Sequence, residues 1–208
     1  MIIEEYKTIF IHIPKNAGTA IEKYFDINNL DTLYPNNERA LKHDTIYEIK
    51  SKFPEKYDSY KKFAIVRNPY ERTVSWYFHL KEEAEREVEF LNTTMEKAFP
   101  FGFIKWLENP FKTQFTKWKL PNNKFVQINK LLDDPQCAWI DKTVTVLKYE
   151  NLNKELNEFF GKEIDLPVIN KTTHEKYLNY YNKYALDIVY DRYKEDFEKF
   201  NYKRITKI

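Results

Sequence analysis

Three short runs of β-branched and aromatic residues, each followed by a helical pattern, limit the possible folds most strongly. The runs are KTIFIHI at 7–13, KKFAIVR at 61–67 and TVTVLKYE at 143–150. Such runs are typical of buried strands. Strands that alternate with helices favour a parallel sheet covered by helices on both faces. The sequence therefore predicts the α/β class, with a central parallel β-sheet flanked by helices.

The helices are predicted from their start and stop signals. Thr19 is expected to cap the first helix, and Asp44 or Thr45 the second. Pro54 ends that second helix, and Gly161 marks the end of a later one. The predicted helices cover 19–25, 44–53, 70–87, 151–160 and much of 174–200.

The length of 208 residues suits one domain with a sizeable hydrophobic core. We expect a single domain over 1–208, with a mainly helical insert on the acceptor side around 84–142 and a short extra strand at NKFVQI (123–128). Aromatic and lysine side chains in the insert suit either sugar binding or, as we prefer, a helical subdomain that buries its rings. They are Phe99, Phe101, Phe103, Trp106, Phe111, Phe115 and Trp118 with Lys105, Lys112, Lys117 and Lys119.

Charge and cysteine content argue against some classes of protein. The net charge is +2, with acids and bases interleaved, which disfavours nucleic acid as the main partner. Cys137 is the only cysteine, so no intrachain disulfide can form. The N-terminus lacks a signal-peptide pattern, and no apolar run reaches the length of a membrane span. We expect a soluble, cytoplasmic protein without an integral membrane segment.

The loop after the first strand, HIPKNAGT at 12–19, has the composition of an anion site. A helix N-terminus offers free N–H groups and a favourable dipole to an anion. Gly18 would let the backbone approach closely, Lys15 adds a positive charge and Thr19 a hydroxyl. The G-x-x-x-x-G-K-[ST] pattern is not met, because the lysine precedes the glycine and the first glycine is missing. An ordinary strand–turn–helix joint with an exposed lysine stays open as the alternative.

VRNPYERTVSWY at 66–77 adds a second set of polar residues. Arg67 ends the second strand, at the edge of the sheet where ligands of α/β proteins bind. Ser75 follows two turns into the next helix, and Arg72, Ser75 and His79 are spaced so that one helix face can carry them. An arginine and a hydroxyl in these places suit a second phosphate.

HIPKNAGT together with VRNPYERTVSWY resembles the two cofactor motifs of the sulfotransferases that use 3′-phosphoadenosine-5′-phosphosulfate (PAPS). LKYENL at 147–152 and DIVYDRYKEDFEKFNY at 187–202 are similar to the carbohydrate branch, which includes the heparan sulfate 2-O-sulfotransferases. NKTTHEKY at 170–177 resembles the family's late cofactor loop. The resemblance implies a P-loop-like three-layer fold. It also implies a set of nucleotide-binding residues: Lys15, Asn16, Ala17, Gly18, Thr19, Ala20, Arg67, Ser75, Lys171, Thr172 and Thr173.

The resemblance further implies the chemistry. A sulfuryl group would pass from PAPS to a hydroxyl, which leaves adenosine 3′,5′-bisphosphate (PAP) as the product. Lys15 would be catalytic, because it neutralises charge on the bridging oxygen as the sulfuryl group leaves. No metal is expected, since no zinc or magnesium motif is visible. The expected acceptor is a carbohydrate hydroxyl on a glycan or glycolipid, and a small alcohol or a tyrosine stays open as an alternative. Ala20 departs from the family, in which a serine is frequent.

The attack on sulfur needs a base that removes the acceptor's proton. We choose His43 in LKHDTIYEI, because this segment resembles the family's short motif with the catalytic histidine. Asp44 would orient the ring of His43 or cap the next helix. His12 is expected to be packed in the first strand, whereas His79 and the carboxylate of Glu150 stay open as alternatives.

Two other functions stay open. A P-loop kinase for a small molecule would need ATP and magnesium, and the missing GK[ST] ending and missing acidic strand tip argue against it. A non-catalytic nucleotide-binding homologue would bind PAP but would be indifferent to the loss of His43 or Lys15 in a transfer assay.

Overall fold

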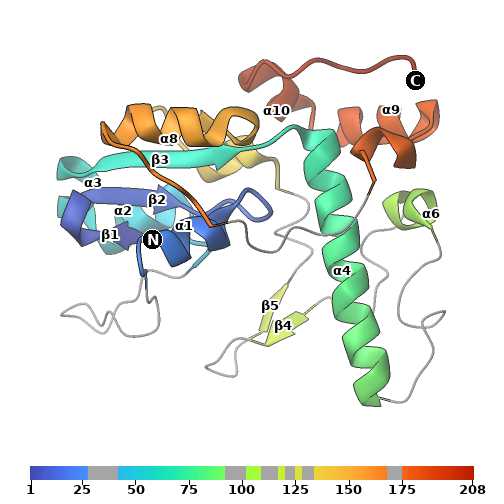
Figure 1. Ribbon diagram of the computed structural model, residues 1–208, viewed down its shortest axis with the longest axis horizontal. Helices are drawn as coiled ribbons and strands as arrows, with labels where there is room; N and C mark the ends of the chain where they lie inside the picture. Colours follow the sequence, from blue (N-terminus) through green and yellow to red (C-terminus); the bar gives the residue numbers. More distant parts are fainter. Residues whose placement is uncertain (28–41, 92–101, 109–116, 120–124, 128–133, 168–174) are drawn as a thin grey trace. The chain divides into compact units, whose positions relative to one another are not determined.

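The computed structural model describes residues 1–27, 42–91, 102–108, 117–119, 125–127, 134–167 and 175–208 (Figure 1). These residues form two units, each made from two stretches of the chain. The first unit comprises Met1–Asn68 and Gln136–Lys171, and the second comprises Pro69–Pro135 and Thr172–Ile208. The single domain predicted over 1–208 stays a prediction.

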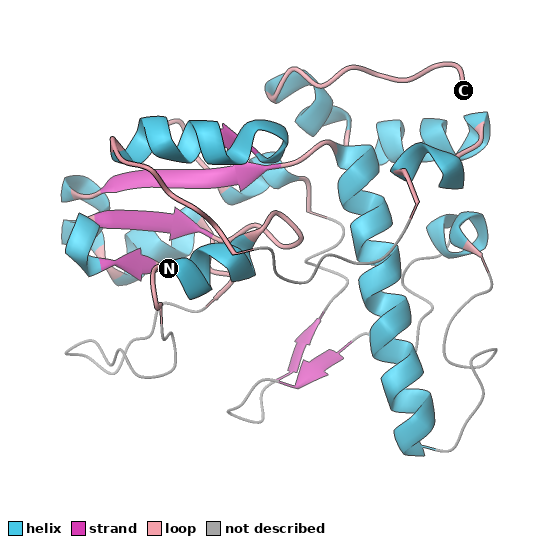
Figure 2. Cartoon of the chain, viewed as in Figure 1, coloured by secondary structure: helices cyan, strands magenta, loops and turns pink. Residues whose placement is uncertain are grey.

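The first unit is built on a four-stranded sheet in the order β1-β2-β3-β6 (Figure 2). β2, β3 and β6 are parallel, and they are the three strands that the sequence predicts. β1 was not predicted and runs antiparallel to β2, because the chain reverses through the 3-10 turn η1 (Glu4–Tyr6). The α/β class is thus confirmed, with one antiparallel edge strand. The strands are β1 (Ile2–Ile3), β2 (Thr8–Ile11), β3 (Lys61–Val66) and β6 (Thr145–Lys148).

The core of this unit lies against the sheet. Residues 63–66 in β3 are all buried, so both faces of this strand are covered. Phe10 and Phe63 stack with ring centroids 4.8 Å apart, and they cluster with Ile21 and Leu156. Burial on both faces explains why residues 63–66 form a continuous apolar run. The helices of the unit are α1 (Gly18–Tyr24), α2 (Ile46–Lys52), α3 (Pro54–Ser59) and α8 (Leu152–Phe160), with the 3-10 turns η2 (Gln136–Trp139) and η3 (Tyr149–Asn151).

The starts of the first two helices differ in how they are capped. Thr19 is not the cap of α1, because the helix begins at Gly18 and Ala17 takes the cap position without a side-chain hydrogen bond. At α2, Thr45 is the cap. Its Oγ1 accepts a hydrogen bond from the backbone N–H of Glu48, whose carboxylate accepts one from the N–H of Thr45. This capping box fixes the start of α2.

Pro54 and Gly161 also mark helix ends. α2 ends before Pro54 as predicted, but Pro54 also opens α3, which the sequence analysis missed. Proline suits the first position of a helix, where its missing N–H has no partner to lose. Gly161 ends α8 in the left-handed conformation, as predicted.

The second unit packs helices around aromatic side chains. Tyr77 contacts the rings of Phe103 and Trp106, with centroid distances of 5.4 Å to each. Phe103 and Trp106 are buried, so the expected burial of the insert's rings is confirmed for these two residues. The side chains of the other aromatic residues named for the insert lie outside the described part. The elements are α4 (Pro69–Leu91), α6 (Phe103–Glu108), the antiparallel pair β4 (Lys117–Lys119) and β5 (Phe125–Gln127), η4 (Tyr177–Tyr180), α9 (Lys183–Arg192) and α10 (Lys194–Lys199).

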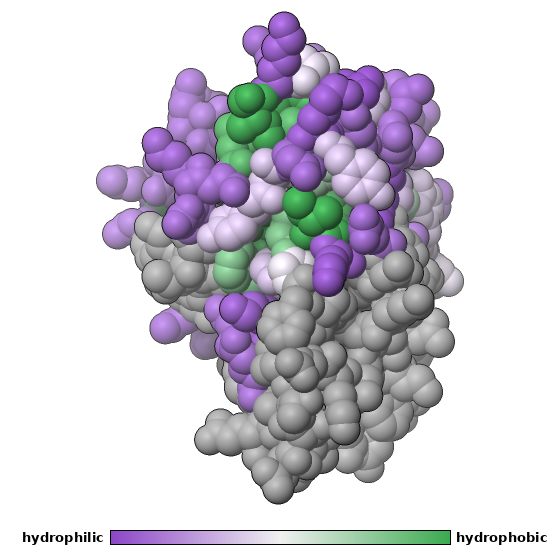
Figure 3. Space-filling model, turned by 90° about the vertical axis from the view of Figure 1, so that its right-hand side faces the viewer, coloured by the Kyte–Doolittle hydropathy of each residue, from purple (hydrophilic) through white to green (hydrophobic). Residues whose placement is uncertain are grey.

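The described residues on one face of the molecule are mainly hydrophilic (Figure 3). Figure 3 shows one face, on which charged and polar side chains surround smaller hydrophobic areas. The exposed large hydrophobic side chains among the described residues are Tyr47, Tyr184 and Ile208. Of the helices that the structure describes, none combines the length and hydropathy that a membrane span requires.

Candidate functional site

The loop after β2 and the residue after β3 lie at one edge of the sheet. β2 and β3 are parallel neighbours, with Ile11 opposite Ala64. β3 and β6 are paired in the same way, with Val66 opposite Lys148. The three strands therefore end side by side. Ligands of open α/β sheets bind at this edge, so the residues that follow the strands form the candidate site.

Lys15 and Ala17 give the loop its shape. Both have a left-handed backbone, with φ of 69° and 59°, and Asn16 between them does not. This conformation costs a residue with a side chain about 1–2 kcal/mol, and residues held in it are common at ligand sites. Alternating handedness turns successive N–H groups toward one concave side, which is a recurrent form of anion site. Lys15, Ala17 and Thr19 are partly exposed.

Two residues of the loop and the start of α1, Asn16 and Ala20, face the interior of the unit. Asn16 is 1% exposed, and its Nδ2 donates a hydrogen bond of 2.7 Å to the carbonyl oxygen of Ile65. Ala20 is also buried. Asn16 and Ala20 were predicted to bind the nucleotide. Since their side chains lie inside the unit, their contribution to an anion would come from the backbone.

Gly18 has a packing role that the sequence analysis did not foresee. Its φ is not positive, so the backbone conformation itself does not require glycine. A Cβ atom at this position would overlap with the imidazole ring of His12. Glycine therefore allows the loop to pack directly on this ring. The predicted close approach of an anion to Gly18 stays a prediction.

His12 is packed under the loop, as predicted. Its Nδ1 lies 3.2 Å from Oε1 of Glu22, and Lys42 donates a hydrogen bond of 2.8 Å to Oε2 of the same carboxylate. Burial lowers the pKa of His12 below its usual value, against the opposing effect of Glu22. Burial alone would raise the pKa of Glu22, but the hydrogen bonds from His12 and Lys42 outweigh it and lower that pKa. Neutral His12 thus donates its Nδ1–H to a charged carboxylate.

His43, the predicted base, lies beside His12. Its Nδ1 is 3.0 Å from the backbone oxygen of His12, and the two ring centroids are 4.6 Å apart. Because a carbonyl oxygen can only accept, Nδ1 carries the hydrogen and Nε2 keeps its lone pair. Burial, followed by the effect of His12, lowers the pKa of His43 to about 3. The ring is therefore neutral at ordinary pH, with Nε2 able to accept a proton.

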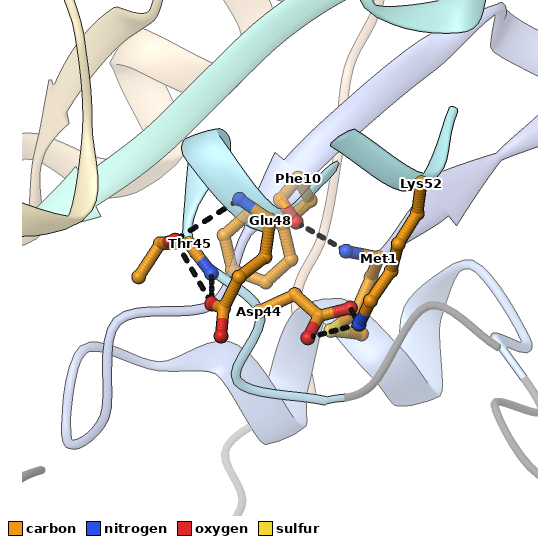
Figure 4. A network of polar contacts seen from close by, with 6 residues as sticks. All are labelled: Met1, Phe10, Asp44, Thr45, Glu48 and Lys52. Carbon is orange, nitrogen blue, oxygen red and sulfur yellow. Dashed lines mark hydrogen bonds and ion pairs between the residues drawn. The ribbon is translucent and has the colours of Figure 1, made fainter. Parts of the chain in front are cut away.

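The residues after His43 anchor it to α2 (Figure 4). Asp44 is buried, and both of its carboxylate oxygens accept hydrogen bonds of 2.7 Å from Nζ of Lys52. Thr45 and Glu48 form the capping box directly after it. Asp44 is thus an ion-pair partner of Lys52 and not the helix cap. The ring of His43 is oriented through its hydrogen bond to the backbone of His12.

Arg67 reaches back to the loop. It is 7% exposed, and its Nη1 donates a hydrogen bond of 3.3 Å to the backbone oxygen of Lys15. Its guanidinium group lies over the ring of Tyr149, which follows β6, at 4.2 Å from the ring centroid. An arginine stacked on an aromatic ring is held in one orientation. The structure therefore brings Arg67 and the Lys15 loop together, as the motifs predict.

Two contributors, Tyr149 and Gln136, had no predicted role, and Glu150 makes a contact that was not foreseen. Tyr149 received no role, although its place at a strand tip was visible. Gln136 hydrogen-bonds with both Asn16 and Arg67, which are 120 and 69 residues away in the chain, and the residues around it give no signal of these contacts. Glu150 accepts a hydrogen bond of 2.7 Å from the backbone N–H of Asn68, so it ties the end of β3 to the end of β6.

The remaining predicted residues belong to the second unit or fall outside the described residues. Ser75 and Arg72 are buried in α4, in the second unit, and His79 in the same helix is half-buried. Arg72 is 2% exposed, with its guanidinium 5.9 Å from the ring centroid of Tyr193. Among the described residues, no group of three His, Cys, Asp or Glu side chains is arranged to hold a metal ion. The late loop falls outside the described residues: Lys171, Thr172 and Thr173.

Comparison with known proteins gives one match. A family model described as "Sulfotransferase family" matches residues 1–203. No curated protein and no solved structure matches the chain. The matched range includes the loop after β2, His43, Arg67 and Ser75. The P-loop-like three-layer fold that the sequence predicts is the fold of this family.

Proposed function

The chain belongs to the sulfotransferase family, and on this premise we propose that it transfers a sulfuryl group from PAPS to a hydroxyl of a carbohydrate. Sulfuryl transfer itself follows from the family, whereas the donor, the acceptor class and the base are the proposal. The observation that carries it is the contact between Arg67 and the Lys15 loop at the carboxyl edge of the sheet. Two cations at one edge suit a nucleotide with two separate anionic groups.

The residues at this edge fit such a nucleotide. Lys15 and Ala17 have a left-handed backbone, and left-handed residues are a recurrent part of backbone anion sites. When bound, PAPS supplies an activated sulfuryl group at its 5′ end and a phosphate at its 3′ position. We assign the 5′ end to the loop and the 3′-phosphate to Arg67. The role of Ser75 as a phosphate contact rests on its motif alone.

Lys15 has the charge that the leaving phosphate needs. Its side chain belongs to a partly exposed residue, so the ammonium group can meet a ligand at the loop. It would neutralise the negative charge that develops on the bridging oxygen, as a preorganised electrostatic contact does in a transition state. This neutralisation by protein cations is why we propose a reaction without a metal.

His43 is proposed as the base that takes the acceptor's proton. Its Nδ1–H is committed to the backbone of His12, which leaves the lone pair of Nε2 for the acceptor hydroxyl. A pKa of about 3 makes a weak base. A nearby anion favours the protonated ring, so a bound nucleotide would raise this pKa toward the range in which general bases are effective.

The acceptor class rests on resemblance. LKYENL and the segment 187–202 are similar to the carbohydrate branch of the family. A glycan or a glycolipid is therefore the proposed acceptor, and a tyrosine-containing peptide is the competing hydroxyl to exclude.

A transfer assay tests the proposal. Purified protein, PAPS labelled with sulfur-35 and EDTA are incubated with oligosaccharides, glycolipids and a tyrosine peptide. Label is expected on a carbohydrate, and His43→Ala is expected to lower turnover by about 10²- to 10⁴-fold. PAP binding should stay near the wild-type value in that variant, and His79→Ala serves as the matched control. Transfer to the peptide alone would refute the carbohydrate assignment. Undiminished turnover in His43→Ala would exclude His43 as the base.

A further inference from the structure

Gln136 connects the two elements of the candidate site. It is 0% exposed and lies at the start of η2. Its Oε1 accepts hydrogen bonds from Nδ2 of Asn16, at 2.8 Å, and from the backbone N–H of Arg67, at 2.9 Å. Its Nε2 donates to the backbone oxygen of Arg67 at 2.9 Å. One side-chain amide thus holds both the loop after β2 and the end of β3.

The contact with Arg67 imitates a neighbouring strand. β3 ends at Val66, so Arg67 is the first residue beyond the strand. The amide of Gln136 pairs with both the N–H and the carbonyl group of Arg67, which a residue on a neighbouring strand does in a ladder. This pairing fixes the backbone from which the guanidinium group extends.

The contact with Asn16 fixes the loop in the same way. Nδ2 of Asn16 uses its two hydrogens for the carbonyl oxygen of Ile65 and for Oε1 of Gln136. The reverse orientation of this amide would place its oxygen against two acceptors, so the assignment of nitrogen and oxygen is determined by the contacts. The loop residue between Lys15 and Ala17 is therefore tied to β3 directly and through Gln136.

We propose that Gln136 is a positioning residue, which sets the placement of the Lys15 loop relative to the guanidinium of Arg67. Burying an amide is unfavourable unless its hydrogen bonds are made, and three hydrogen bonds of the Gln136 side chain go to these two elements. The affinity for a ligand that is held at two points depends on the separation of these points, because small errors in placement weaken binding. The consequence for PAP rests on the proposed function, whereas the effect on the free protein does not.

Two variants and one control separate positioning from general stability. Gln136→Met keeps a side chain of similar length and removes the three hydrogen bonds. Gln136→Glu keeps an oxygen that accepts hydrogen bonds and loses the Nε2 donor. It replaces Gln136→Met in the measurements if the methionine variant does not fold. Asn157→Leu is the control, because the side-chain amide of Asn157 in α8 accepts a part-buried hydrogen bond of 2.7 Å from the backbone N–H of Ile164 in the same unit.

Amide hydrogen exchange of the ligand-free protein tests the placement itself. In Gln136→Met, exchange is expected to accelerate at 15–19 and at 67–68, with α8 unchanged. In Asn157→Leu, it is expected to accelerate near Ile164 and not at the loop. Unchanged exchange at the loop, or the same acceleration throughout the unit, would overturn the positioning role.

Calorimetric titration with PAP tests the consequence. Gln136→Met, or Gln136→Glu in its place, is expected to raise the Kd by about tenfold or more, as the loss of buried hydrogen bonds implies. Asn157→Leu should bind like the wild type. An unchanged Kd in a folded Gln136 variant would overturn the proposal. If the wild type fails to bind PAP while loop exchange still accelerates in Gln136→Met, the proposed donor is wrong and the positioning role stands.

Discussion

Arg67 and Arg72 belong to the same motif, both are nearly buried, and both guanidinium groups lie over a tyrosine ring. Their surroundings differ. Arg67 stands at the strand tips of the first unit, 4.2 Å from the ring of Tyr149, and donates to the backbone of Lys15. Arg72 lies in α4 of the second unit, 5.9 Å from the ring of Tyr193 between α9 and α10.

The difference teaches that residue type and burial do not identify an arginine that binds a ligand. The groups that the guanidinium contacts identify it. The guanidinium of Arg67 is oriented at a sheet edge where ligands bind, next to a loop with a strained backbone. Arg72 joins a helix to the aromatic interior of its own unit, where its stem and charge contribute to packing. We therefore expect Arg67 to matter for affinity and Arg72 for stability.

The largest expected effect is that of Arg67→Ala on nucleotide binding. The variant loses a charge-assisted contact with phosphate, so the Kd for PAP should rise by about 100-fold or more. The Kd of Arg67→Lys should lie between those of Arg67→Ala and the wild type, because lysine keeps the charge and loses the planar guanidinium group. Titration calorimetry measures both. A Kd near the wild-type value in Arg67→Ala would contradict the assignment of Arg67 to the phosphate.

Arg72→Ala should act on stability. Removing this buried side chain leaves a cavity and disrupts its buried contacts, which is expected to cost about 2–4 kcal/mol in the free energy of unfolding. Urea unfolding measures the loss, and PAP binding is measured on the protein that stays folded. Weakened PAP binding with unchanged stability would assign Arg72 to the nucleotide instead.

Gly18→Ala tests how the loop is seated. The added methyl group would clash with the ring of His12, and overpacking of this kind costs about 1–3 kcal/mol. His12→Ala in the same chain should recover part of the loss, because the ring that clashes is gone. Gly161→Ala is the control, since it meets open space at a positive φ and should not depend on His12. If Gly18→Ala lowers the free energy of unfolding equally in the wild type and in His12→Ala, the clash with the His12 ring is not the cause.

The stability of the first unit should depend on pH. The pKa of His43 falls from 6.5 in the unfolded chain to about 3 in the folded one, so the unfolded chain binds more protons between these values. Stability is therefore full above about pH 6.5 and is lost as the pH falls, by at most about 1.4 kcal/mol per pH unit for this group. Urea unfolding at several pH values measures it. The same acid loss in His43→Ala as in the wild type would exclude His43 as a source.

Local patterns predicted much of the fold. β2, β3 and β6 follow from runs of β-branched and aromatic residues, and the end of α8 follows from Gly161. Errors arose where one residue fits two roles. Pro54 was interpreted only as a stop, although proline also opens helices, and Thr19 was expected to cap a helix that begins one residue earlier.

The site was predictable only in part. Lys15 and Arg67 were found because each follows a predicted parallel strand, and the ends of such strands meet at one edge. Gln136 was not found, because its contacts join distant parts of the chain and leave no local pattern. The seating of Gly18 on His12 likewise depends on packing that no spacing of residues reveals.

The central claim is that this sheet edge binds a nucleotide through both its 5′ and its 3′ anionic groups. Titration calorimetry of the wild-type protein with PAP, beside AMP, ADP and ATP in the absence of metal, tests it most directly. We predict tight binding of PAP and much weaker binding of the three nucleotides that lack a 3′-phosphate. Equal binding of PAP and AMP, or a preference for ATP once magnesium is added, would contradict the claim.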